Sequence, residues 1–289
     1  MKMKVIATCA AILMSNLALA QSSKMQNPDI LGIRIGMSKT EVMAIIKEKF
    51  PKSKLKNVSK EVTIGTADLI YDAQTNISLD ITKPTITEDN LRLSFLPDDT
   101  VIAVRRFIRY VPRKQTTADI HVGLKEKFGE LSYFVYDDTT QFEDRTMWSD
   151  RMLPGLSLVG TNYVQGHYIS PGDFGTVTPY PYCWAEMSTY FTDTYNPKEI
   201  YQSLTDRSGV SLNRANKWKS CGKALWVSNL HERSQLNFYA TQTEMILMDL
   251  SSAPEQMLSM PTMLKNNPKT TYAKPVTELP KPNANTPNF

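Results

Sequence analysis

SKTEVMAIIKEKFP at residues 38–51 and TTADIHVGLKEKFG at residues 116–129 are two stretches of one chain that align without a gap. Both contain the letters KEKF, and in each stretch the next and last residue is one that ends helices, Pro51 or Gly129. A four-letter match alone is weak, because Lys and Glu are common on solvated helix faces. The alignment extends over fourteen positions, however, and it predicts two amphipathic helices of one design.

The two helices share their start signal and their apolar stripe. Ser38 stands three residues before Glu41, which is a capping box, and Thr116 with Asp119 is its weaker counterpart. The stripes consist of Val42, Ile45, Ile46 and Phe50 in the first helix, and of Ile120, Leu124 and Phe128 in the second. These stripes predict that each helix packs on a core, with the Lys and Glu residues of KEKF in solvent.

Segments of alternating polar and apolar residues follow each helix, as in strands that have one buried face. A turn at Pro97-Asp98-Asp99-Thr100 separates two such segments and predicts a hairpin. The fold class is therefore α+β, with two related units that each place a helix on an antiparallel sheet. The first unit covers residues 21–112. The second covers residues 113–251 and is enlarged by a Gly-, Pro- and Tyr-rich insertion at residues 153–222.

Both ends of the chain differ in composition from these units. Residues 1–20 combine Lys2 and Lys4, an apolar core and an Ala-x-Ala site, which is typical of a signal peptide cleaved after Ala20. This leader predicts a periplasmic or secreted protein. Residues 252–289 are rich in Pro, Asn and Lys, and this composition predicts a disordered tail.

Charge and hydropathy exclude two classes of partner. Loss of Lys2 and Lys4 with the leader lowers the formal net charge from +4 to +2, which does not indicate nucleic-acid binding. No later stretch approaches the roughly 20 apolar residues of a spanning helix, so we expect no integral membrane segment.

The insertion contains the best candidate binding residues. Aromatic rings on irregular backbone are typical of interfaces and of sugar-binding platforms. The alternative is that the rings fold back as a small satellite core. The candidates are Tyr163, Tyr168, Phe174, Tyr180, Tyr182 and Trp184.

The start of the first unit resembles a known family. The stretch DILGIRIGMSKTEV at residues 29–42 is similar to the opening of BamE-like (SmpA/OmlA) periplasmic modules, which the β-lactamase inhibitor protein uses in tandem. The resemblance implies a helical layer on an antiparallel sheet, in envelope proteins that bind other proteins. This chain departs from the pattern, because no lipid-acceptor Cys stands near Ala20 and VPRKQTTAD at residues 111–119 replaces the GMS opening in the second unit. No binding residue can be transferred from the family.

Signatures of catalysis are missing from the sequence. The histidines His121, His167 and His231 form no HExxH, and there is no G-x-S-x-G elbow, phosphate loop or EF-hand pattern. We therefore expect no catalytic residues, no metal ligands and no cofactor. An acidic cluster after the second helix is interpreted as solvated turns and strand ends: Asp137, Asp138, Glu143, Asp144 and Asp150.

Basic residues gather in the first unit and have two interpretations. They could form a surface for an anionic partner, or they could solubilise a helix end and protect an edge strand from aggregation, which we favour. The residues are Lys47, Lys49, Lys52, Lys54, Lys56, Lys60, Arg105, Arg106, Arg109 and Arg113.

Together these features predict an exported, non-catalytic protein that binds another cell-envelope protein as a scaffold, accessory factor or inhibitor. The alternative is a peptidoglycan- or glycan-binding module, or a hydrolase, that uses the aromatic residues of the insertion.

The mature chain has two cysteines, Cys183 and Cys221, and an even count in an oxidising compartment predicts one disulfide. It would close a loop of about 39 residues and contribute about 3–4 kcal/mol by the loop-entropy model. Two separate buried thiols are the alternative. We expect maleimide to label no thiol when the mature chain is denatured without reductant, and two labels per chain would refute the pairing.

Overall fold

The computed structural model describes residues 27–64, 66–129, 133–137, 143–150, 219, 221–234 and 237–272. The leader, residues 153–218 of the insertion and residues 273–289 of the tail lie outside these ranges. The predictions for those segments therefore stay predictions.

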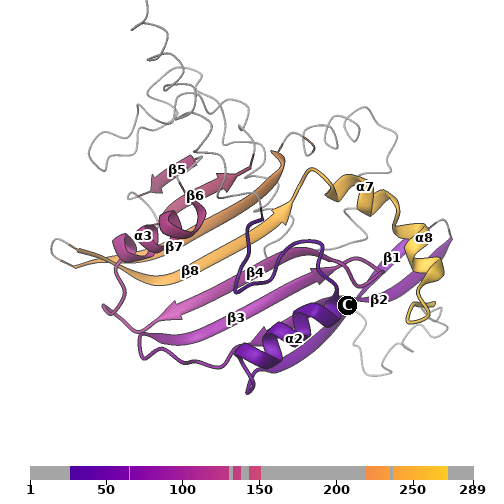
Figure 1. Cartoon of the computed structure of the whole chain (residues 1–289), viewed down its shortest axis with the longest axis horizontal. Helices are drawn as coiled ribbons and strands as arrows, with labels where there is room; N and C mark the ends of the chain where they lie inside the picture. Colours follow the sequence, from indigo (N-terminus) through magenta and orange to yellow (C-terminus); the bar gives the residue numbers. More distant parts are fainter. Residues whose placement is uncertain are drawn as a thin grey trace, which may run out of the picture.

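One large antiparallel sheet organises the described residues (Figure 1). Its strands lie in the order β1-β2-β3-β4-β8-β7-β6-β5, and the short β9 pairs with β2. The first four strands are β1 (Lys54–Ile64), β2 (Ala67–Ser78), β3 (Ile86–Phe95) and β4 (Val101–Tyr110). The others are β5 (Tyr133–Asp137), β6 (Glu143–Ser149), β7 (Lys223–Ser234), β8 (Asn237–Asp249) and β9 (Thr271–Tyr272). The α+β class with an antiparallel sheet is thus confirmed.

The two predicted helices are present and lie on the same face of the sheet, called the helix face below (Figure 1). They are α2 (Lys39–Lys49) and α3 (Thr117–Phe128). The capping box of α2 is complete, since the Glu41 N–H donates to Ser38 Oγ and the Ser38 N–H donates to the Glu41 carboxylate at 2.8 Å. These hydrogen bonds from Ser38 lower the pKa of Glu41. Thr116 caps α3 in the same way through the Asp119 N–H.

The predicted hairpin is also confirmed. β3 and β4 pair in antiparallel register, and the Asp99 N–H donates to the Leu96 carbonyl within the turn. Asp99 has a φ of 66°, in the left-handed region, where Asp is among the few side chains that are tolerated.

Strand β4, which carries Arg105, Arg106 and Arg109, does not lie at an edge. It pairs with β3 on one side and, through Ala103↔Met248 to Arg109↔Gln242, with β8 on the other. The prediction that its arginines protect an edge strand is therefore wrong. Lys54, Lys56 and Lys60 do lie on a terminal strand, because β1 ends the sheet.

Residues 253–272 are ordered, contrary to the prediction of a disordered tail from residue 252. They form α7 (Ala253–Leu258), α8 (Met260–Asn266) and β9. Pro254 and Pro261 stand in the first turns of these helices, where the missing N–H costs nothing. The fully buried side chains of Met257 and Met260 join the core on the face opposite α2 and α3.

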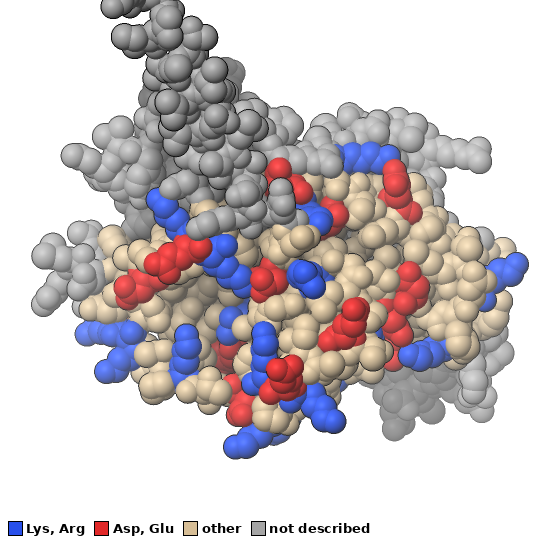
Figure 2. All heavy atoms as spheres, viewed as in Figure 1, with Lys and Arg blue, Asp and Glu red and all other residues tan. Residues whose placement is uncertain are grey.

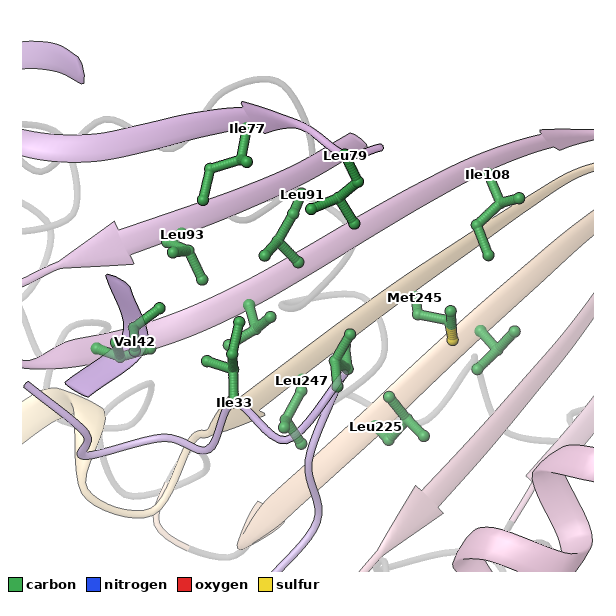
Figure 3. Packing of buried hydrophobic residues seen from close by; sticks show 14 of the residues in the cluster. Ile33, Val42, Ile77, Leu79, Leu91, Leu93, Ile108, Leu225, Met245 and Leu247 are labelled. Atoms are coloured by element: carbon green, nitrogen blue, oxygen red, sulfur yellow. The ribbon is translucent and has the colours of Figure 1, made fainter. Parts of the chain in front are cut away.

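The core of the helix face fills the space between α2, α3 and the sheet. It also takes Ile30 and Ile33 from the N-terminal segment, which is defined as residues 27–37. Figure 3 shows its apolar side chains converging from this segment, from α2 and from several strands. The apolar stripes of both helices thus pack on the sheet as predicted, with Val42, Ile46, Leu124 and Phe128 buried.

Cys221 is fully buried in the core of the opposite face. Cys183 lies outside the described residues. The Cys183–Cys221 pairing therefore remains a prediction.

Candidate binding cleft

A cleft of about 580 Å³ opens on the helix face between α3, the C-terminal end of α2 and the loop that joins β2 to β3. Its volume is within the range of sites that enclose a ligand, about 300–1,000 Å³. Figure 2 shows this face, on which acidic and basic side chains are intermixed. The cleft is therefore a candidate binding site among the described residues.

The walls of the cleft are mostly apolar. Ile120 and Leu124 of α3 form one wall, and Phe50 and Ile81 contribute to the opposite side. Ile81 lines the cleft and keeps 46% of its surface exposed. The walls can therefore accept apolar groups from a partner.

The floor of the cleft is polar and is formed by strands at the centre of the sheet. Arg106 of β4 donates from Nε and Nη2 to the two carboxylate oxygens of Asp89 on β3, at 2.9 and 2.6 Å. Asp89 is only 6% exposed, and both residues occupy positions in their strands that face the core of the helix face. A buried charge pair of this kind is retained only with good geometry, because desolvation opposes it.

A row of hydrogen bonds continues across the sheet from the floor. The Tyr110 hydroxyl donates to Thr243 Oγ1 at 3.2 Å, and Thr243 donates to Asn229 Oδ1 at 2.6 Å. Asn229 in turn donates to Asp144 Oδ1 at 2.7 Å, and His121 Nε2 lies 3.1 Å from the other oxygen of Asp144. The row thus joins β4, β8, β7 and β6 to α3.

Burial raises the pKa of Tyr110, although the hydrogen bond to Thr243 and the charge of Arg106 act in the opposite direction. The phenol therefore stays protonated and keeps its role as a donor at neutral pH.

Helix α3 is anchored to the sheet at both ends. At its start, the Ala240 N–H of β8 donates to the Gln115 carbonyl at 2.8 Å. At its end, Trp148 Nε1 of β6 donates to the Gly129 carbonyl at 3.0 Å, and the rings of Trp148 and Phe128 lie 5.9 Å apart.

The lysines of the two KEKF segments bind the N-terminal segment, which we had not predicted. Lys49 Nζ donates to the Leu31 carbonyl at 3.0 Å, and Lys127 Nζ donates to the Asp29 carbonyl at 2.9 Å. Lys127 also contacts the Asp29 carboxylate at 2.8 Å. The expectation that the Lys residues of KEKF are merely solvated is therefore wrong for Lys49 and Lys127.

A tight turn presents the segment to these lysines. Leu31 and Gly32 have φ angles of 61° and 90°, and Ile30 and Ile33 exchange two backbone hydrogen bonds of 3.0 Å across them. Burial raises the pKa of Asp29, but the Lys127 and Gly32 hydrogen bonds outweigh it, so this pKa lies below its ordinary value. The Asp29 carboxyl group is therefore ionised at neutral pH.

The aromatic candidates of the insertion are not among the described residues. Tyr163, Tyr168, Phe174, Tyr180, Tyr182 and Trp184 all lie outside the described ranges. The glycan alternative, which depends on them, stays a prediction.

One prediction about charged residues needs correction. Asp144 is not a solvated turn residue, because it is buried and bonded to Asn229. Each of Arg105, Arg106 and Arg109 pairs with an acidic residue, which counts against one basic surface, the interpretation that we did not favour.

The floor residues were missed because we read charged residues in strands as solvent-facing. Asp89 shares the alternation of Leu91 and Leu93, and Arg106 shares that of Val104 and Ile108. A signal for the pair was present in the sequence. The predicted hairpin joins two strands, and each strand has a charged residue, of opposite sign, at a position where the alternation calls for a buried side chain.

Within the described ranges, no cluster of three or more His, Cys, Asp or Glu side chains could hold a metal ion. None of the helices in those ranges has the length and apolar character that a bilayer crossing requires.

The burial of the Arg106–Asp89 pair predicts how substitutions of these residues change the free energy of unfolding. Arg106→Met leaves the buried carboxylate of Asp89 without its partner and should cost about 3–5 kcal/mol. Arg106→Met combined with Asp89→Leu should recover most of this loss, because no unpaired charge remains. Arg109→Met is the matched control on the same strand, and it should cost less than about 1 kcal/mol since the Arg109–Glu88 pair is exposed. Urea unfolding measures all three, and equal losses for the single and double variants would contradict the assignment.

Comparisons with models of protein families, with curated proteins and with solved structures find no match for this chain. The functional conclusion therefore rests on the cleft and on the sequence.

Proposed function

We propose that this protein is an exported, non-catalytic binding protein that receives a segment of another cell-envelope protein in the cleft of its helix face. The leader and the BamE-like opening support the location and the class of partner. This proposal puts the binding site in the cleft, and the aromatic residues of the insertion stay a separate prediction.

The observation that carries the proposal is the composition of the cleft. Apolar walls surround a floor on which Arg106 and Tyr110 already have partners within the protein. An arrangement of this kind offers burial and a few fixed hydrogen-bonding groups, which is what a binding site requires.

We also propose that the protein consists of two related units, each with one helix followed by four strands. The sheet order supports this, since β1-β2-β3-β4 and β5-β6-β7-β8 meet in opposite directions at the β4–β8 pair. Helix anchoring supports it too. Ser38, the N-cap of α2, bridges to Thr100 just before β4, and Thr116, the N-cap of α3, bridges to Tyr239 near the start of β8. Lys49 and Lys127, which align with each other, both bind the N-terminal segment.

Photo-crosslinking tests the binding proposal. A benzoylphenylalanine at position 81 lies at the cleft, whereas one at position 258 lies on α7, and both Ile81 and Leu258 are 46% exposed. We expect irradiation of cells to give a discrete protein adduct from position 81 that position 258 does not give. Mass spectrometry then identifies the partner. Equal patterns from the two positions, or no adduct at position 81, would refute the proposal.

A chimera tests the two-unit proposal. Residues 38–51 are replaced by the sequence of residues 116–129, with Met43 and Ile45 retained because both pack against the core. The apolar volumes are nearly conserved, so we expect a loss of less than about 2 kcal/mol in urea unfolding. The control carries the same residues shifted by one position, which turns the stripe away from the sheet and should unfold the protein. A chimera as unstable as the shifted control would argue against equivalent helices.

A further inference from the structure

We infer that the cleft binds an uncharged, extended peptide segment whose apolar side chains enter the cleft and whose backbone lies against Gly123 of α3. The inference rests on the proposed function, because it specifies the chemistry of the partner segment at the same site. Three observations carry it: a glycine within a helix, the balance of charge, and the free donors of the floor.

Gly123 lies in the middle of α3, exposed, and lines the cleft. Glycine at an exposed helix interior costs about 1 kcal/mol relative to alanine. A Cβ added to Gly123 would meet no atom within 4 Å, so the fold does not require a glycine there. Glycine also serves where another backbone approaches closely, and this is the use that the cleft explains.

The aligned position in α2 strengthens this point. Ile45 corresponds to Gly123 in the gapless alignment of the two helices, and it packs against the core of the helix face. The apolar stripe is therefore continuous in α2 but interrupted in α3. The interruption lies at the wall of the cleft and leaves room for an apolar group from outside.

The charges that line the cleft disfavour a charged ligand. Arg106 pairs with Asp89, and Lys127 pairs with Asp29. The remaining charged lining residues are Asp80, Lys83 and Asp119. Because the lining sums to one negative charge, a carboxylate or phosphate ligand would meet net repulsion, and the cleft could neutralise no more than one positive charge of a ligand.

The floor still offers donors to a peptide group. Arg106 uses Nε and Nη2 for Asp89, while its Nη1 has no hydrogen-bond partner among the described residues. The side chain is 18% exposed. A guanidinium that is already neutralised by a carboxylate suits a backbone carbonyl better than a second anion. Thr82, Thr85 and Gln115 add polar groups at the rim.

The probe for the experiment is a display library of random octapeptides, selected on the immobilised mature chain and counter-selected on its Gly123→Ile variant. We expect the enriched peptides to carry apolar residues at alternate positions and few charges. Enrichment of acidic or basic peptides would overturn the inference, and so would a failure to enrich or recovery of the same peptides by Gly123→Ile.

The sharper measurement uses one enriched peptide in fluorescence anisotropy with three variants of α3. Gly123→Ala should raise the urea midpoint yet weaken peptide binding by roughly tenfold, which corresponds to about 1.4 kcal/mol. Gly123→Ile should abolish binding. Val122→Ala is the control, because Val122 is 57% exposed and does not line the cleft, and it should leave the affinity unchanged.

A Gly123→Ala variant that is more stable but binds the peptide more weakly shows that Gly123 serves binding and not the fold. If Gly123→Ala raises the midpoint and leaves the affinity unchanged, the backbone contact is refuted. If no peptide binds while position 81 still gives its adduct in cells, the peptide class is wrong and the proposed function stands. Loss of both signals would refute both.

Discussion

The pairing of β4 with β8 is the constraint on which the rest of the structure depends. Seven residue pairs, from Ala103↔Met248 to Arg109↔Gln242, join two groups of four strands into one sheet. Since each group carries its own helix on the same face, the pairing sets α2 and α3 apart across the central strands. The cleft exists because the helices do not meet, and the N-terminal segment with its two lysine contacts fills part of the gap.

Features that depend on neighbouring residues could be predicted from the sequence. The caps at Ser38 and Thr116, the stripes of both helices and the hairpin at residues 97–100 are all fixed by patterns within about four residues of each other. The position of β4 could not be predicted, because its partner β8 lies far along the chain and no local pattern specifies it. The helices α7 and α8 were missed for a different reason: the disordered tail was predicted from its Pro-rich composition, although Pro254 and Pro261 stand where Pro is favoured, in the first turn of a helix.

Stability alone does not explain the buried charges at the polar floor of the cleft. A buried ion pair is weak evidence for stability, since an apolar pair of similar size is often as stable or more so. Arg106 and Asp89 occupy core-facing positions where Leu or Ile would pack without desolvation. Keeping charges there makes sense when the arginine has a second role toward a ligand. The basic residues of β4 do not act as a single surface, because alternation along the strand sends Arg105 and Arg106 to opposite faces of the sheet.

The separation of β4 from β8 in sequence bears on how the chain acquires its structure. The Arg105–Glu244 contact that crosses this pair joins residues 139 positions apart. During synthesis the first four strands are complete long before β8 exists, and until then β4 presents a hydrophobic strand edge to other chains. Such non-local topology is slow to form, and a half-built sheet is prone to aggregate. If the chain is exported, as we propose, this order of synthesis also means that the central sheet cannot close before the C-terminal part of the chain has been made.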